Sequence, residues 1–352
     1  MPKPHALLRA GFPYLKTIGR KGITNHPTAI AFGKEGRIYS LTWGAIKVTN
    51  ENEEDLGDIG IRWTDRDPIP DTSVIDEGIL VWPLGIAVDS QENIYVSDEG
   101  IHRISVWNSE GDFLRKWGEL GSGDGQLDRP AGIAFSLDED LYVVDSMNHR
   151  VQKFTNEGDF LMTWGSFGDA EGEFNMPWGV AVDADGDVYI SDWRNDRIQK
   201  FTSDGEFIFS FGKSGTGDGQ LDRPMGIALD GDYDIYVVDR CGVEPTRAGH
   251  NRVQLFSPEG RYVQKFMGDA TMSDSERDLI WTRKRLLRLR EMTDMEDAKR
   301  FRHIISVTVD DQGRMFVPDW NAYRIQVYQK ESYQLEEGDL APALRAPTLS
   351  SN

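Results

Sequence analysis

The ten residues "GSGDGQLDRP" at 121–130 occur again, with one letter changed, as "GTGDGQLDRP" at 215–224. A looser copy, "GDAEGEFNMP", occupies 168–177, so the phrase returns at steps of 47 residues. A long fixed period is typical of an architecture assembled from repeated units. One position inside the phrase varies, because the residue before the proline changes from Arg129 to Met176 and back to Arg223.

The repeat extends toward both ends of the chain. In each copy a proline precedes an apolar run such as "GIAVD", and three further runs rich in β-branched and aromatic residues follow. Gly, Asp and Asn separate these runs, which indicates short strands joined by turns rather than helices. A sixth copy, "HIISVTVDDQGRMFVPDWNAYRIQVY", lies at 303–328. The prolines of the first five copies are Pro27, Pro83, Pro130, Pro177 and Pro224.

Four antiparallel strands in each of six units predict an all-β fold, a six-bladed β-propeller. The sixth copy ends after its third strand at Tyr328, whereas "GFPYLKTIG" at 11–19 resembles the fourth strand "GDFLRKWG" at 111–118. We therefore expect the N-terminal strand to close the ring as the outer strand of the last blade, leaving no unpaired inner edge. The expected propeller covers 11–333, and 334–352 is expected to be a flexible C-terminal tail.

The run "LYVVDSMNHRVQKFTNEGDF" at 141–160 resembles the NHL repeat, and the resemblance covers residues 11 to about 328. NHL propellers serve as RNA- or protein-binding modules and as enzymes such as the peptidylglycine amidating lyase, so the resemblance implies the fold and leaves the function open. In that lyase, zinc histidines directly follow the blade prolines. We do not carry its activity over, because the matching positions here are Thr28, Leu84, Ala131, Trp178, Met225 and Ile305.

Composition narrows the classes of partner. The 352-residue chain has a net charge of −20, which disfavours nucleic acid and an anionic membrane surface. Cys241 is the single cysteine, so an internal disulfide and a multi-cysteine metal site are excluded. No run approaches the ~18 apolar residues of a membrane helix, and "MPKPHALLRAGF" lacks the apolar stretch of a secretory signal. The predicted location is cytoplasmic; the cofactors and the oligomeric state are unknown at this stage.

Insertions gather on one face of the expected propeller. The blade 5 link near "CGVEPTRAG" gains 8 residues, the link between blades 5 and 6 gains about 24, and the link over 62–82 is also long. Such a bias predicts the binding face. Within 269–302, Ser273 followed by Glu276 has capping-box spacing and predicts a helical lid. The lid is rich in arginine, and a solvated helix face is the alternative to contact with a ligand.

Residues at equivalent positions in the six blades should form rings at the mouth of the channel. The ring before the proline is His26, Trp82, Arg129, Met176, Arg223 and His303, and the ring after the second strand is Trp43, Glu99, Ser146, Trp193, Arg240 and Trp320. Aromatic walls with a few polar groups suit a small, partly apolar organic anion. The expected ligand-binding residues are Arg129, Arg223, Trp43, Trp82, Met176, Trp178, Trp193, Met225 and Trp320.

His26 and His303 belong to neighbouring blades and are the expected general acid and base, since histidine titrates near neutral pH. Whether they hold a metal is left open. Three structural alternatives stand beside these assignments: the histidines bond to backbone at strand starts, the arginines pair with the preceding aspartates, and the tryptophans pack between blades. The recurring Asp/Arg pairs, of which Asp145/Arg150 is one, are assigned to hydrogen bonds that tie the blades.

The function favoured by the sequence is an enzyme or binder for a small molecule, with a lyase or a hydrolase as the candidate reaction classes. The alternative is an NHL scaffold for protein interaction that uses the same face. RNA is the less favoured partner because the chain is acidic. A narrow, lidded pocket would support the small molecule, and a broad open face would support the scaffold.

Overall fold

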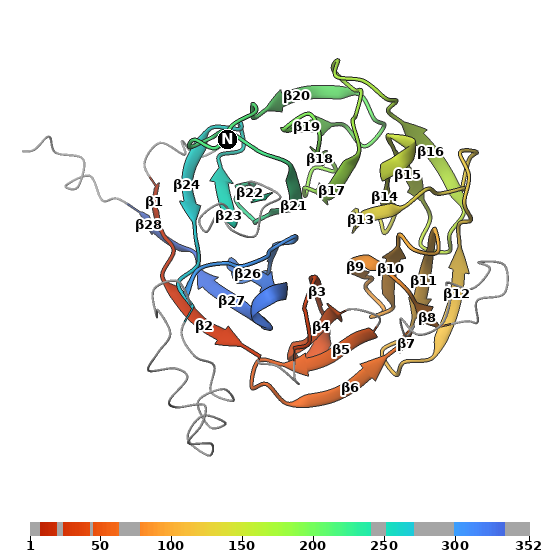
Figure 1. Cartoon of the computed structure of the whole chain (residues 1–352), viewed down its shortest axis with the longest axis horizontal. Coiled ribbons are helices and arrows are strands. Elements are labelled where there is room, and N and C mark those ends of the chain that lie inside the picture. Colours follow the sequence, from red (N-terminus) through yellow and green to blue (C-terminus); the bar gives the residue numbers. More distant parts are fainter. Residues whose placement is uncertain are drawn as a thin grey trace, which may run out of the picture.

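A computed structural model describes residues 8–19, 24–42, 45–62, 78–240, 251–270 and 299–334. Six four-stranded antiparallel sheets are arranged as blades around a central axis (Figure 1). The first strands of all six blades line a channel of about 490 Å³. The all-β, six-bladed propeller predicted from the repeat is therefore confirmed.

In blades 1 to 5, the strands run outward from the axis in chain order. Blade 1 is β3 (Ala29–Phe32), β4 (Arg37–Thr42), β5 (Ala45–Asn50) and β6 (Asp55–Ile59). Blade 2 is β9 (Pro83–Val88), β10 (Ile94–Asp98), β11 (Arg103–Trp107) and β12 (Phe113–Trp117). Blade 3 is β13 (Pro130–Phe135), β14 (Leu141–Asp145), β15 (Arg150–Phe154) and β16 (Phe160–Trp164). Blade 4 is β17 (Pro177–Val182), β18 (Val188–Asp192), β19 (Arg197–Phe201) and β20 (Phe207–Phe211).

Blade 5 is β21 (Pro224–Leu229), β22 (Ile235–Arg240), β23 (Asn251–Phe256) and β24 (Tyr262–Phe266). Blade 6 is β25 (Thr308–Val309), β26 (Arg314–Asp319), β27 (Arg324–Gln329) and, from the other end of the chain, β2 (Tyr14–Ile18). The helices formed wholly by described residues are the 3-10 turns η2 (Lys34–Gly36), η3 (Ser146–Asn148) and η4 (Trp320–Ala322). The predicted helical lid falls mainly on 271–298, and the predicted tail, apart from Gln334, falls on 335–352; both of these segments lie outside the described residues.

The two ends of the chain meet in blade 6. β2 pairs antiparallel with β27, with Ile18 opposite Ile325, so an N-terminal strand is the outer strand of that sheet. β1 (Leu8–Gly11) then pairs with β28 (Glu331–Gln334), a contact that the sequence pattern did not indicate. A short parallel pair, β7 (Ile61–Arg62) with β8 (Ile79–Leu80), joins the ends of the long link between blades 1 and 2.

Charged side chains reinforce this seam on the face where turns join the first strand of a blade to its second and the third strand to its fourth. Glu51, in blade 1, accepts from Lys16 of β2 at 2.7 Å and from Arg314 of β26 at 2.7 Å. The Arg314 guanidinium, with Lys16, lowers the pKa of Glu51 to about 2. On the other side of blade 6, the Nζ of Lys330 contacts three carboxylates of the blade 5 turn at 2.6–3.1 Å, those of Asp230, Asp232 and Asp234.

The glycine of the "PxGIA" pattern lets neighbouring blades approach near the axis. A Cβ added at Gly132 would lie 2.7 Å from the carbonyl oxygen of Trp178, and one at Gly85 would lie 2.6 Å from that of Ala131. Backbone at that distance excludes any side chain, so these positions require glycine. The core lies between the blades; between blades 2 and 3 it includes the fully buried side chains of Tyr95 and Val143.

The repeated phrase forms a loop around an arginine of its own blade. Arg150 donates through Nε to the Asp145 carboxylate at 2.8 Å, and its Nη atoms donate to the backbone oxygens of Ser122, Gly123 and Gln126 at 2.8–3.0 Å. Arg197 makes the same bonds to Asp192 and to the backbone oxygens of Asp169, Ala170 and Glu173. The predicted architectural role of these pairs is confirmed here and for Arg252 with Asp239.

Candidate functional site

Four of the five residues that precede a blade proline have an unusual backbone. His26, Arg129 and Met176 have φ of 53°, and Arg223 has φ of 59°, which is the left-handed region. That region is unfavourable for residues with a Cβ, so it needs support from neighbours. A side chain of the preceding blade accepts the N–H in three cases: His102 Nδ1 at 3.1 Å from Arg129, His149 Nδ1 at 3.0 Å from Met176, and Asp196 Oδ1 at 2.7 Å from Arg223.

The support acts on the backbone, so the side chain before the proline is free to vary. This explains why the repeated phrase keeps its loop and changes that one residue. His102 and His149 accept at Nδ1 and must therefore be neutral to make these bonds. Burial lowers the pKa of both imidazoles, which is consistent with the neutral form.

A cavity of about 310 Å³ lies at the mouth, over blade 1 and between blades 2 and 6. It adjoins the central channel, because Leu84 and Ile305 line both. The expected residues Trp82, Trp320 and His303 line this cavity. The remaining lining residues are Thr28, Pro83, Leu84, Glu99 and Ile305.

Glu99 and His303 are the titratable groups that line the cavity, and they come from blades 2 and 6. Burial raises the pKa of Glu99, while the positive charge of Arg129 opposes the rise and the negative charge of Asp98 adds to it. A carboxyl group shifted this way keeps its proton to higher pH and suits a general acid. The sequence places Glu99 in the ring of residues after the second strand. It was not among the expected site residues, because a mouth expected to bind an anion gives no reason to include a carboxylate.

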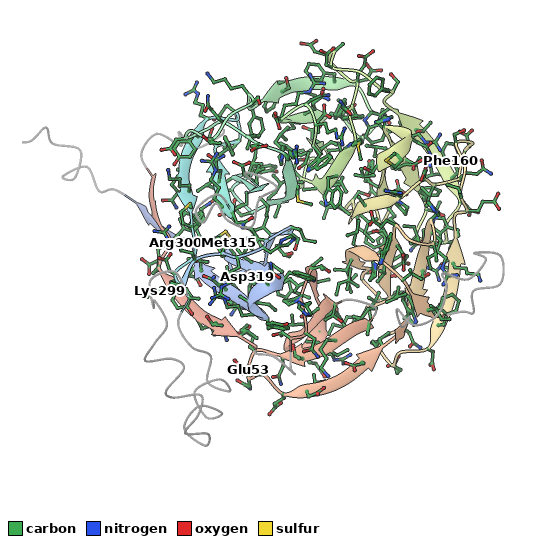
Figure 2. The ribbon with its side chains drawn as sticks, viewed as in Figure 1. Glu53, Phe160, Lys299, Arg300, Met315 and Asp319 are labelled. Carbon is green, nitrogen blue, oxygen red and sulfur yellow. The ribbon has the colours of Figure 1, made fainter. Side chains whose placement is uncertain are left out.

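The backbone around His303 fixes its place at the mouth. Its N–H donates to Oδ1 of Asp319 at 3.0 Å, and its carbonyl accepts from the N–H of Trp320 at 2.9 Å. Asp319 is fully buried at the end of β26, and Figure 2 shows it on the axial side of blade 6, with Lys299 farther from the axis. The imidazole centroid lies 5.3 Å from that of Trp320.

His26 contacts the same tryptophan. Its ring centroid lies 4.6 Å from that of Trp320 and 4.3 Å from that of Tyr323. Its Nδ1 is 3.1 Å from the carbonyl oxygen of Trp320. A carbonyl only accepts, so Nδ1 donates and Nε2 is the acceptor in the neutral ring. Trp320 thus connects the two histidines, and His26 does not line the cavity.

The other expected ligand residues lie around the rest of the mouth. The rings of Trp178 and Trp193 are 6.2 Å apart, and the guanidinium carbon of Arg223 is 5.4 Å from the Trp193 centroid. Arg129 is exposed and Met176 half-buried, whereas Met225 is buried, with 3% of its surface exposed. Trp43 lies outside the described residues.

The local ion pairs considered for the two arginines are not formed within the described residues. Asp128 lies 3.4 Å from Nδ1 of His102 instead, and the Asp196 carboxylate binds the Arg223 backbone N–H. In the described ranges, no group of three or more His, Cys, Asp or Glu side chains is placed to hold a metal ion. Among the described residues there is also no helix with the length and apolar character needed to cross a membrane. The cytoplasmic location stays a prediction.

Comparison with known proteins supports the repeat. The NHL repeat model matches residues 80–107, 127–154 and 174–201, which lie in blades 2, 3 and 4. Protein brain tumor from Drosophila melanogaster is 43% identical over 51 residues. That match takes in 14% of this chain and 5% of the fly protein, so the chain spans a small part of this relative.

Solved structures resemble the whole propeller. Virginiamycin B lyase from Staphylococcus aureus, in a catalytically inactive histidine-to-alanine variant with quinupristin, has a TM-score of 0.53 at 13% identity, covering 94% of this chain and 90% of the lyase. A protein of unknown function from Bacteroides thetaiotaomicron has a TM-score of 0.57 at 17% identity, covering 92% and 76%. Identities this low show a shared fold alone. The three repeat matches and the six-bladed arrangement support an NHL-repeat β-propeller family for this chain.

Proposed function

We propose that this protein is an enzyme that binds a small organic molecule at the mouth of the channel and transfers protons between that molecule and two side chains. In this proposal, His303 is the general base and Glu99 the general acid, on opposite walls of the cavity. His26, which contacts Trp320, positions the His303 wall. Arg129 and Arg223 attract the anionic part of the molecule from the rim.

The observation that carries the proposal is the pairing of Glu99 with His303 in one cavity between Trp82 and Trp320. An acid and a base on opposite walls suit an elimination, in which the base removes a proton from carbon and the acid protonates the leaving group as its bond breaks. Hydrolysis, in which the base activates water, uses the same groups. The fold-level likeness to a lyase, for which a histidine variant is described as inactive, favours elimination.

The experiment compares Glu99→Gln and His303→Gln with wild type. A panel of small organic anions, including linear and cyclic esters, is screened by mass spectrometry for turnover and by calorimetry for binding. Products whose total mass equals that of the substrate indicate elimination: two fragments from a linear ester, or one ring-opened isomer from a cyclic ester. A gain of one water indicates hydrolysis. We expect each variant to lose turnover by roughly a hundredfold or more while binding changes little. Wild-type turnover in both variants would contradict the proposal.

A protein-interaction scaffold is the second candidate, and a specific observation favours it. Leu120 and Phe167 occupy equivalent positions in the links of the mouth face and are 60% and 67% exposed. Trp82 on the same face is 43% exposed. Exposed apolar groups on one face are typical of protein contacts. The double variant Leu120→Ser/Phe167→Ser separates the two candidate functions, because it should keep turnover and lose only the binding of a protein partner.

A further inference from the structure

We propose that Arg194, Arg223 and Trp193 form a binding subsite for an oxyanion group, a phosphate ester or a carboxylate, carried by a small molecule. These residues belong to the links at the mouth ends of blades 4 and 5. They lie across the channel from the Glu99–His303 cavity, as the positions of β17 and β21 relative to β3 show (Figure 1). Arg194 did not stand out in the sequence, because it is one position beyond the ring after the second strand.

Both guanidinium groups converge on one indole ring. The guanidinium carbon of Arg194 lies 5.2 Å from the Trp193 centroid, and that of Arg223 lies 5.4 Å from it. Cations at this distance from an aromatic ring are held by the electron density of its face. The ring therefore contacts two like charges at the mouth without neutralising either.

No carboxylate neutralises these charges within the part of the chain that the structure describes. Neither Arg194 nor Arg223 forms an ion pair there, although the whole chain carries a net charge of −20 and other arginines, such as Arg150 and Arg314, are paired with acids. The nearby Asp196 carboxylate accepts the backbone N–H of Arg223 at 2.7 Å. Two unpaired guanidinium groups that contact the same indole ring in an acidic protein favour the binding of an anion.

The neighbouring aromatic groups define the rest of the ligand. Trp178 lies 6.2 Å from Trp193, so the subsite has an apolar wall beside the two cations. Guanidinium groups bind planar or tetrahedral oxyanions through two parallel hydrogen bonds. An oxyanion attached to an aryl or alkyl group fits this combination.

This inference rests on the proposed function only in assigning the oxyanion to the molecule that enters the Glu99–His303 cavity. The subsite itself is tested with phenyl phosphate and inorganic phosphate, using the full-length chain, calorimetry and tryptophan fluorescence. Arg194→Gln and Arg223→Gln should each weaken phenyl phosphate binding about tenfold or more. Trp193→Phe should weaken it less, since it keeps an aromatic ring beside the two guanidinium groups.

Arg261→Gln is the matched control, because Arg261 is exposed on the opposite face of blade 5 and should leave binding unchanged. Glu99→Gln should also bind phenyl phosphate normally, so loss of turnover and loss of oxyanion binding are separate readouts. Wild-type binding of phenyl phosphate by the Arg194→Gln/Arg223→Gln double variant would overturn the proposal. Tighter, competitive binding of an acidic peptide would also overturn it, in favour of a protein partner at these arginines.

Discussion

Replacing Arg197 with alanine removes the arginine around which the blade 4 loop is folded. The side chain donates to the Asp192 carboxylate at 2.9 Å and to the backbone oxygens of Asp169, Ala170 and Glu173 at 2.8–2.9 Å. The variant leaves those three oxygens without this donor and leaves the fully buried Asp192 without its cation. We expect the loop over 168–177 to lose order together with the blade.

The magnitude follows from the buried charge. Removing one partner of a buried ion pair costs about 3–5 kcal/mol. An unfolding entropy of roughly 2.1 cal/mol/K per residue over the whole chain converts this to a fall in Tm of about 4–7 °C. Asp192 keeps the N–H of Asn175 at 2.8 Å and can also take up a proton, because burial already raises its pKa. A folded pKa above the unfolded one means that stability is lost as pH rises, so the deficit should be larger at pH 8 than at pH 5.

Thermal and urea unfolding of wild type, Arg197→Ala, Arg197→Lys and Arg261→Ala measure this. Lysine cannot supply the fork of donors that the three oxygens require, so Arg197→Lys should recover less than half of the loss. The exposed Arg261 should cost no more than about 0.5 kcal/mol. A loss below about 1 kcal/mol for Arg197→Ala would refute the structural role assigned to Arg197. A stability deficit that shrinks with rising pH would also refute it.

Three further outcomes are expected. Glu51→Gln should lower the free energy of unfolding by about 1–2 kcal/mol at neutral pH, a figure already discounted for solvent screening. Urea unfolding measured against pH should show this difference from wild type vanish as pH falls from about 4.5 toward 2. Gly132→Ala should cost at least about 2 kcal/mol in the same assay, and Gly172→Ala only about 1 kcal/mol, because a Cβ at 172 meets no atom within 4 Å and its cost is the positive φ. Protonating His149, followed by NMR, should break its bond from the Met176 N–H, so stability should decline as pH drops below about 6.5.

Repetition made the fold predictable from sequence. Asp145 and Arg150 are spaced as in other blades, and the recurring pattern around them indicates an architectural pair. The contact between β1 and β28 could not be anticipated, because both strands have four residues and neither belongs to the repeat. Strand pairing of this kind is decided by where the ends of a closed ring meet rather than by local propensity.

The sequence predicted which residues surround the mouth of the channel, but not the direction of their side chains. Blade order indicated that His26 and His303 are neighbours, and both rings contact Trp320. Spacing along the chain does not determine the direction of a side chain, so it could not predict the bond of His26 to the Trp320 carbonyl or the presence of Glu99 in the same cavity as His303. Arg194 has no counterpart at equivalent positions in other blades, so the repeat gave no reason to examine it.

Two kinds of position in the repeat therefore have different roles. Where the residue itself recurs, as with Arg150 and Arg197, the side chain makes the bonds that hold the blade, and replacing it should cost stability. Where the backbone recurs and the residue varies, as at Arg223, the bond to the preceding blade comes from the N–H, which any residue other than proline supplies. The side chain at such a position contributes little to folding. Its identity is then set by what reaches the mouth of the channel, which makes this ring the part of the molecule where relatives with the same fold can differ in ligand.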